Sequence, residues 1–525
     1  MKIENLKLKI RSDKGIGVLE VIISLMVITS AVTAVILVVY SNQDIRLDNE
    51  VNNVALYRAS EIIEKARVAG AVDFNAVISS SSLNDIFTEG LAVSDSSPCR
   101  KDIAGSVNWS IKASRSQNVY LTTTLISQDE AEDLGYDCDL SGGPISEWWH
   151  PDTFVSVDFG SLGGDNNGTS ATSIEVITKN GSKYAVLSST HGTTTVPDVW
   201  VVDVTDVTDG AAPYTTSLEG SLDLSAGLNE IDVAGDYAFA ANYENQKQLH
   251  VIDMLDLAVP DGLASISLSG VNPAGSYPQG RKVFYYNDRV YVGINETAGA
   301  EFHVFDVSDP ADPIHLGGLE LFHNVHDIIV RGNYAYLATS DNTGEVMMID
   351  VSNPGALDDV PYPLNPYHPD NSGMKFNVPG DYDGTSLYLL GNKLYLGRKG
   401  GYNNSAIHNF FVLDISQPTA IVSLGSKYIT RNPNVALGLT AIAVSNKFAF
   451  LGTDDSNFEF QVFRIDNPAN IQNCGEPGYP GGFVNCGKYN FPAKITDLEY
   501  DDSFVFASVQ SNDAFRVIFD DLSQY

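Results

Sequence analysis

A six-residue pattern typical of a buried strand recurs seven times in the part of the chain that follows residue 190. Successive copies begin 44 to 64 residues apart, and the first five carry aspartate at their fifth position. The copies are VWVVDV from 199, LHVIDM from 249, FHVFDV from 302, VMMIDV from 346, FFVLDI from 410, FQVFRI from 460 and FRVIFD from 515. Repetition of this kind indicates one supersecondary unit used many times. A repeating architecture must therefore account for most of the chain.

A second pattern precedes most copies: an apolar strand, a turn containing Gly, Asn or Asp, and a strand rich in aromatic residues. Residues 231–240 and 328–338 illustrate it, and an outer strand such as Ile314–Leu319 completes the unit. Four strands in such a unit are the content of one propeller blade. The sequence therefore predicts an all-β seven-bladed β-propeller over residues 148–525. We also expect the repeated aspartate, for example Asp203, to accept hydrogen bonds from the backbone of the following turn.

The seventh unit contains only three predicted strands before Tyr525, so its fourth strand must come from another part of the chain. Residues Thr153–Phe159, TFVSVDF, alternate between apolar and polar side chains as a strand does. We expect this segment to pair with residues 515–520 and close the ring, because closure removes an exposed sheet edge.

The first strands of the units should surround the central channel of the propeller. Their alignment places polar or charged residues at one repeated position in most units, and we expect this ring to line one mouth of the channel. The candidate ligand site consists of Glu230, Lys282, Asp327, Ser386 and Asp497, with Ala441 at the equivalent position of the sixth unit. Such a ring could hold a cation or a small polar ligand, and the alternative is a solvated funnel without a ligand.

Catalytic and metal-binding motifs are missing from the sequence. It contains no Gly-x-Ser-x-Gly, no HExxH and no phosphate-binding loop. His323 and His326 lie three residues apart, which is weak evidence for a metal site. We expect no enzymatic activity, no cofactor and no metal. The net charge of −35 argues against binding to nucleic acid.

The N-terminal segment has a different character. Residues 16–40 are predominantly apolar and carry one charge, Glu20. This segment is long enough to span a bilayer, and basic residues precede it. Basic flanks stay on the cytoplasmic side, so the part of the chain after the apolar segment should be exported. An amphipathic stretch continues to Gly70, and the sequence predicts one helix over residues 16–70. Two alternating runs, 107–113 and 119–126, predict a small sheet within residues 71–147.

All four cysteines lie after the apolar segment, in a part of the chain for which export predicts an oxidising compartment. Their grouping favours the disulfides Cys99–Cys138 and Cys474–Cys486 over the two other connectivities. A zinc site is the alternative, although the spacing of the cysteines does not match the usual zinc motifs.

Lys14, Gly15, Ile16, Gly17, Val18, Leu19 and Glu20 resemble the cleavage and methylation motif of type IV prepilins and of secretion pseudopilins. This resemblance implies that residues 1–15 are a leader peptide, that a prepilin peptidase cuts after Gly15, and that Ile16 becomes N-methylated. Glu20 would pair with the new N-terminal amine of a neighbouring subunit during assembly. Ile16 stands where the family usually has Phe, and Gly17 where it has Thr or Ser.

The resemblance implies a fold class as well: an α+β pilin-like N-terminal module, with a long helix (16–70) and a small β domain (71–147), before the propeller. The repeats themselves resemble LVIVD-type repeats over residues 170–525.

The function expected on these grounds is that of a minor or tip pilin-like subunit of a type IV pilus, displaying the propeller for adhesion or recognition. Its partners would be other pilin subunits, the prepilin peptidase, the assembly machinery of the inner membrane and an unknown surface ligand. It would lie in the cytoplasmic membrane first and in an extracellular filament afterwards. The alternatives are a membrane-anchored or secreted propeller that acts as an enzyme or binds a ligand, and a pseudopilin of a type II-like secretion system.

Overall fold

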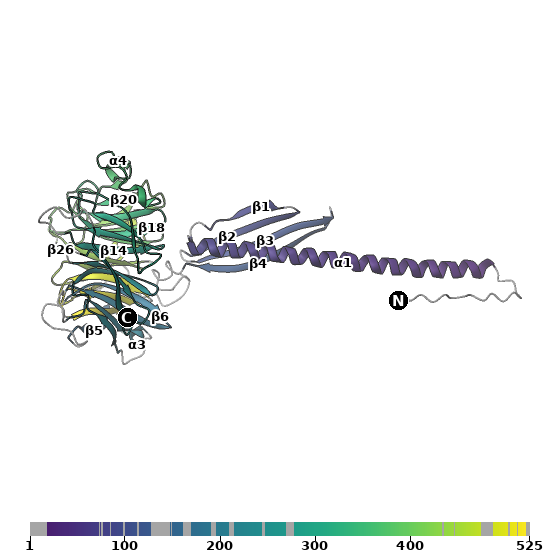
Figure 1. Cartoon of the computed structure of the whole chain (residues 1–525), viewed down its shortest axis with the longest axis horizontal. Coiled ribbons are helices and arrows are strands. Elements are labelled where there is room, and N and C mark those ends of the chain that lie inside the picture. The colour runs from purple at the N-terminus through teal and green to yellow at the C-terminus, as the bar shows by residue number, and fades with distance from the viewer. Residues whose placement is uncertain are drawn as a thin grey trace. The chain divides into compact units, whose positions relative to one another are not determined.

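The computed structural model describes residues 18–520, with gaps. The gaps are 73, 75–76, 85, 98–99, 113–114, 128–147, 149, 161–169, 191–195, 209–214, 244–246, 269–277, 433–434, 446, 474–486, 502–503 and 512. The chain forms two compact units, one of residues 1–96 and 100–125 and one of residues 97–99 and 126–525. Figure 1 labels helices and strands of each unit.

The first unit contains the helix α1 (Val18–Val72) and one four-stranded antiparallel sheet. The strands follow chain order: β1 (Ser80–Asn84), β2 (Phe87–Ser97), β3 (Arg100–Lys112) and β4 (Arg115–Ile126). Ala55, Ala59 and Ile63 lie on one helical face and are buried. The two alanines cluster with Val107 of β3, and Ile63 clusters with Ile103 of the same strand. A Cβ atom at Gly105 would lie 3.0 Å from Ala59 O, so glycine allows the strand to approach the helix closely.

The fold class predicted for the N-terminal part was wrong. The described structure is dominated by four-stranded antiparallel sheets. The physical reason is that hydrophobic periodicity predicts a helix, whereas the class of a domain depends on how its elements pack. Within the described residues, no helical segment combines the length and the hydropathy needed to cross a bilayer.

Several N-terminal predictions fall on residues that the structure does not describe. Gly15 and Ile16 lie outside the described residues, and so does the side chain of Glu20. The four cysteines, Cys99, Cys138, Cys474 and Cys486, lie outside them too. The cleavage, methylation, assembly and disulfide assignments therefore stay predictions.

The second unit is a ring of seven antiparallel sheets, counted over its described residues. Each sheet runs from an inner strand to an outer strand, and the inner strand of each sheet contacts that of the next. The inner strands β6 and β33 also contact each other, so the ring is closed. Each sheet is one blade of a β-propeller.

The strands of blades one to four, from inner to outer, have the following bounds. Blade one has β6 (Ala171–Lys179), β7 (Ser182–Ser189), β8 (Val199–Asp203) and β9 (Ser217–Leu222); blade two has β10 (Leu228–Ala234), β11 (Tyr237–Asn242), β12 (Leu249–Asp253) and β13 (Asp261–Ile266). Blade three has β14 (Gly280–Tyr286), β15 (Arg289–Ile294), β16 (Phe302–Asp306) and β17 (Ile314–Leu319); blade four has β18 (Val325–Arg331), β19 (Tyr334–Thr339), β20 (Val346–Asp350) and β21 (Lys375–Phe376).

Blades five to seven share the same plan. Blade five has β22 (Gly384–Leu390), β23 (Lys393–Arg398), β24 (Phe410–Asp414) and β25 (Val422–Lys427). Blade six has β28 (Leu439–Val444), β29 (Phe448–Thr453), β30 (Phe460–Arg464) and β31 (Gln472–Asn473), with β32 (Lys488–Tyr489) also on β30. Blade seven has β33 (Ile495–Asp501), β34 (Phe504–Val509), β35 (Asp513–Asp520) and β5 (Pro151–Asp158). A separate hairpin joins β26 (Thr430–Asn432) to β27 (Val435–Ala436).

Short helices lie between the strands: α3 (Thr205–Thr208), η2 (Pro354–Ala356), α4 (Pro369–Ser372) and η3 (Pro468–Asn470). Of these, η2 and α4 lie in the long connection between β20 and β21 of blade four.

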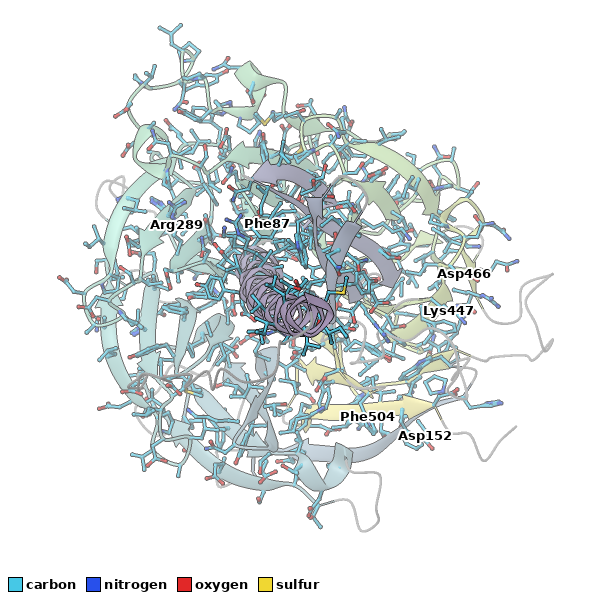
Figure 2. The ribbon with its side chains drawn as sticks, turned by 90° about the vertical axis from the view of Figure 1, so that its right-hand side faces the viewer. Phe87, Asp152, Arg289, Lys447, Asp466 and Phe504 are labelled. Carbon is cyan, nitrogen blue, oxygen red and sulfur yellow. The ribbon has the colours of Figure 1, made fainter. Side chains whose placement is uncertain are left out.

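Blade seven contains strands from both ends of the propeller sequence. The segment predicted to close the ring overlaps β5, which pairs with β35 so that Val157 lies opposite Phe515 and Thr153 opposite Ile518. The Asp520 carboxylate accepts hydrogen bonds from Trp148 N (2.9 Å) and His150 N (3.0 Å). Figure 2 labels Asp152 of β5 and Phe504 of β34, which belong to this same sheet.

The repeated aspartates cap the turns that follow the third strands, as predicted. Each accepts a backbone N–H bond from the residue two positions later, for example Asp203 from Thr205 N (2.9 Å) and Asp350 from Ser352 N (2.9 Å). Asp253, Asp306 and Asp414 make the equivalent bonds. The aspartate at the fifth position is thus a structural feature of the blade.

A second repeated contact was not predicted. The residue immediately before the third strand is buried, and its side chain accepts a backbone N–H from the segment that follows the fourth strand. These residues are Asp198, Gln248, Glu301, Glu345, Asn409 and Glu459. They all stand one position before the recurring pattern, a signal that alignment of the copies would have revealed.

Candidate functional site

The third residue of each inner strand supplies the ring that the sequence placed at the channel mouth. Lys282 of β14 forms an ion pair with Glu230 of β10, and its Nζ lies 3.9 Å from Asp327 Oδ1 of β18. Asp497 of β33 interacts electrostatically with the same lysine. The side chains of Glu230, Lys282 and Asp327 are 15%, 21% and 17% exposed, so they keep some contact with solvent. The structure thus brings four of the five predicted residues together.

Ser386, the fifth predicted residue, is not joined to this group by any described contact. It is only 4% exposed, and its hydroxyl has no hydrogen-bond partner among the described residues. Ala441, at the equivalent position of blade six, is buried and has no polar group to offer. The ring is therefore charged only in blades two, three, four and seven.

Residues at this third position also join neighbouring blades. Asp327 accepts from Leu387 N of blade five (2.7 Å), and Asp497 accepts from Ile174 N of blade one (3.2 Å). The blade-one equivalent, which sequence reasoning missed, is Ser173, whose hydroxyl accepts from Ile231 N (2.9 Å). The ring therefore has a structural role in addition to any ligand that it binds.

Burial governs the acidity of these carboxyl groups. It raises the pKa of Asp497 to about 6, although Lys282 opposes the rise. It also raises the pKa of Glu230 and of Asp327. For Lys282 burial acts in the other direction, but the three surrounding carboxylates outweigh it and raise its pKa. The lysine is accordingly charged at neutral pH, and Glu230, Asp327 and Asp497 all interact with its positive charge.

The second position of the inner strands distinguishes two blades from the rest. In five blades its side chain donates to a backbone carbonyl of the next blade, as Thr172 does to Leu228 O (2.9 Å). Asn229, Thr385, Thr440 and Thr496 make the equivalent bonds. Blades three and four carry Arg281 and His326 instead. Neither makes the equivalent bond within the described part of the chain, so both side chains can form other contacts.

Arg281 and His326 belong to a cluster of basic side chains, which we call the basic cluster and which also includes Lys399 and Lys494. Burial is the largest of the causes that lower the pKa of His326 to about 4, and the positive charge of Arg281 and of Lys399 contributes in the same direction. Burial and Arg281 likewise lower the pKa of Lys494. These effects place Arg281 within electrostatic range of both His326 and Lys494, and Lys399 within range of His326.

Polar neighbours orient the basic cluster. Arg281 donates from Nη1 to Asn295 Oδ1 (2.9 Å). Asp383 Oδ2 lies 3.8 Å from His326 Nε2 and 3.6 Å from Lys399 Nζ. His326 Nε2 itself is buried and has no hydrogen-bond partner in the part of the chain that the structure describes. A ligand could therefore form a hydrogen bond with His326 Nε2.

A metal centre is not indicated at this site. His323 lies 3.7 Å from Asp341, whereas His326 approaches Asp383, so the two histidines face different carboxylates. Among the described residues, no group of three or more His, Cys, Asp or Glu side chains is arranged to hold a metal ion.

Comparison with known proteins finds one repeat of a known family in the propeller. Residues 324–358, which span the first three strands of blade four, match the LVIVD repeat family model. A search of curated proteins gives no match. The crystal structure of BamB from Moraxella catarrhalis is similar at 12% identity and a TM-score of 0.36, over 66% of this chain and 84% of that one. At this TM-score the likeness carries no argument about function.

The sheets and the repeat match together define this chain as a repeat β-propeller protein that contains an LVIVD repeat. Nothing in these comparisons supports a pilin N-terminal segment.

Proposed function

We propose that this protein is a ligand-binding β-propeller, and that the basic cluster at the channel mouth binds a small polar ligand through an anionic group. The observation that carries the proposal is the replacement of the inter-blade donor by Arg281 and His326 in two adjacent blades. Threonine or asparagine at this position would stabilise the ring, so the two basic residues need another explanation.

Charge supports an anionic group. The chain carries a net charge of −35, yet the positive side chains of Arg281 and Lys399 act on His326, and Arg281 also acts on Lys494. His326 itself is neutral at neutral pH, because its pKa is lowered to about 4. Cations concentrated on a strongly acidic protein create a local potential that selects anions. The guanidinium of Arg281 can bind a carboxylate with two parallel hydrogen bonds. The exposed Lys399 would attract the ligand, and His326 Nε2 would complete its hydrogen bonding.

Citrate is a suitable first probe, because its carboxylates and hydroxyl match this chemistry. We expect citrate to bind the full-length protein in calorimetry, and Arg281→Ala to weaken binding about tenfold or more, since a hydrogen bond to a charged group contributes about 1.5–3 kcal/mol. Arg289→Ala is the matched control, because Arg289 instead donates to Val351 O (3.0 Å) and is labelled in Figure 2. Equal affinities of the two variants would rule out the basic cluster as the site.

We propose as a second candidate that the protein is exported and processed as a type IV pilin-like subunit. The support is the sequence from Lys14 to Glu20, followed by α1 from Val18 onward. Mass spectrometry of the N-terminus of the protein recovered from cells tests it. A mature chain that begins at Ile16 is the expected result, and an intact Met1 would contradict the processing and leave a propeller that is anchored or secreted by other means.

A further inference from the structure

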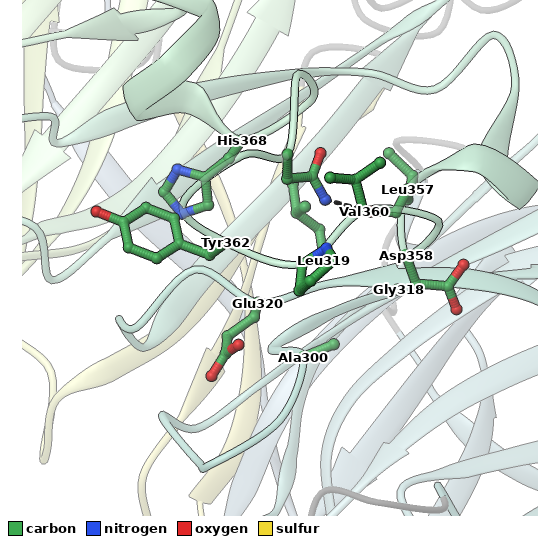
Figure 3. A pocket seen from close by; sticks show the side chains of 11 residues that line it. Ala300, Gly318, Leu319, Glu320, Leu357, Asp358, Val360, Tyr362 and His368 are labelled. Atoms are coloured by element: carbon green, nitrogen blue, oxygen red, sulfur yellow. Dashed lines mark hydrogen bonds between the residues drawn. The ribbon is translucent and has the colours of Figure 1, made fainter.

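A cavity of about 190 Å³ lies beside the outer strand of blade three (Figure 3). Leu319 of β17 and Glu320 line one side of it, and Val360, Tyr362 and His368 of blade four line the other. The blade-four residues belong to the connection between β20 and β21. This connection accounts for the longest interval between copies of the repeat, 64 residues. The cavity thus depends on an insertion that the other blades lack.

Aromatic rings gather beside this cavity and remain exposed. The rings of Tyr362 and Phe322 meet edge to face with centroids 4.9 Å apart, and Tyr362 lies 4.8 Å from His368. Tyr362 is 43% exposed and Phe322 is 38% exposed. Large aromatic side chains that leave the core and cluster at a cavity mark an interaction site more often than a single exposed ring does.

Phe322 adopts a backbone conformation that a bulky residue rarely occupies, with φ of +62°. The buried carboxylate of Glu301 holds it there, because it accepts from Leu321 N (2.6 Å) and Phe322 N (3.1 Å). Strained conformations of this kind persist only where the surroundings impose them, and they cluster at functional sites. The chain therefore presents this phenylalanine at the cavity at a cost in strain.

His368 contributes a hydrogen-bond donor without a partner. The side chain is 1% exposed, and its Nδ1 accepts from Asp370 N (3.2 Å). The proton of the neutral ring must then be on Nε2, since burial lowers the pKa of His368. No described residue accepts a hydrogen bond from Nε2. In Figure 3 the ring of Tyr362 lies against that side of His368.

Two carboxylates offer acceptors at the same cavity. Glu320 and Asp358 both line it, and neither forms an ion pair within the described residues. The amide of Asn365, in contrast, is already used: it donates to Leu357 O (2.6 Å) and accepts from Tyr367 N (2.8 Å). A ligand in this cavity therefore meets carboxylate acceptors, an aromatic face and one N–H donor.

We propose that this cavity binds one pyranose ring of a neutral saccharide. The C–H face of the ring would stack on Tyr362, its hydroxyls would donate to Glu320 and Asp358, and one of its oxygens would accept from His368 Nε2 after the exposed Tyr362 ring rotates aside. A cavity of about 150 Å³ holds one benzene ring, so about 190 Å³ suits one six-membered sugar ring. An organic cation would satisfy the carboxylates and rings but not the N–H donor, and an anion would be repelled.

The test uses the full-length protein and saturation-transfer NMR with the methyl glycosides of glucose, galactose and mannose. We expect at least one glycoside to bind, with transfer strongest to the ring C–H protons that face Tyr362. Tyr362→Ala and Glu320→Gln should each weaken that binding about fivefold or more. Leu364→Ala is the matched control, because Leu364 lies in the same insertion, is 79% exposed and does not line the cavity.

Several results would overturn the proposal. One is binding of tetramethylammonium without binding of any glycoside, which would assign the cavity to a cation. Another is the absence of binding by all four probes. A third is glycoside binding that Tyr362→Ala and Glu320→Gln leave unchanged, which would place the sugar elsewhere. Because Arg281 does not line this cavity, citrate binding is an independent measurement.

Discussion

Replacing Arg398 with methionine should lower the free energy of unfolding of the propeller by about 3–5 kcal/mol. The guanidinium is fully buried and forms an ion pair of 2.8 Å with Glu345, which is also fully buried. It further donates to four backbone carbonyls, those of Pro379, Gly380, Tyr382 and His408. Methionine fills a similar volume but leaves the Glu345 carboxylate and these oxygens without their donor. An uncompensated buried charge is the main cause of the expected loss.

Urea denaturation followed by tryptophan fluorescence measures this loss. The double variant Arg398→Met with Glu345→Gln should recover part of the stability, because it removes the isolated charge. Arg464→Met is the matched control: its ion pair with Asp466 is 24% and 39% exposed, and such pairs contribute about 0–1 kcal/mol. If Arg398→Met and Arg464→Met destabilise the protein equally, the buried pair does not stabilise blades four and five as we infer.

The sequence was sufficient for the features that repeat. The third strands of the seven blades share a pattern of apolar residues, and the first five also keep an aspartate at a fixed position, so their number and the turns of those five could be predicted. Asp203 and Asp350 illustrate this, because each acts within two residues of itself. A contact of such short range depends on local sequence alone.

Features that depend on register between blades were harder to predict. The ring of Glu230, Lys282 and Asp327 could be assembled by aligning the inner strands, but Ser386 occupies the same position and turns out to be buried without a partner among the described residues. Alignment gives the position of a residue in its strand, whereas the packing of its neighbours decides whether its side chain is buried and what it contacts. Arg281 was overlooked because only the contacts of the other blades show what it replaces.

Contacts between residues that lie far apart in the sequence could not be predicted from the sequence. Glu345 and Arg398 lie 53 residues apart in different blades, and nothing in the local pattern of either predicts their pairing. The cavity beside blade three is similar, since Glu320 and Tyr362 come from segments with no shared motif. At the N-terminus, the spacing of the apolar residues predicted a helix, and the structure contains it as α1. The same spacing did not determine the fold class.

The acidic composition of the chain is related to two of its features, the buried carboxylates of the blades and the basic cluster. A net charge of −35 is carried mainly on the surface, yet several carboxylates are buried where they accept backbone N–H groups, as Asp198, Glu301 and Asp497 do. Burial raises the pKa of each of these three groups, to about 6, about 7 and about 6. The blades are therefore held together partly by acids that desolvation makes easier to protonate, while the few basic residues are left for ion pairs and for the basic cluster.

Ending the chain at Ser511 should have the largest effect of all, because it removes β35 and with it the closure of the ring. Phe515, Val517 and Ile518 are completely buried, and burial of three such side chains contributes about 5–9 kcal/mol. The truncation would also leave β34 and β5 with unpaired edges and expose the apolar side chains that β35 covers. We expect the unfolding midpoint to fall further than in Arg398→Met, and the truncated protein to aggregate.

A chain that ends at Asp520 is the control, because it keeps β35 whole, together with the carboxylate that binds Trp148 N and His150 N. It should unfold like the full-length protein. A synthetic peptide of residues 512–525, added in trans, should restore part of the lost stability by occupying the place between β34 and β5. If the chain ending at Ser511 keeps its unfolding midpoint, the ring does not need its terminal strand, and each blade must be stable through its contacts with its neighbours alone. Because the seven inner strands contact one another in a closed circle, we expect the opposite: loss of one junction weakens the blades on both sides of it.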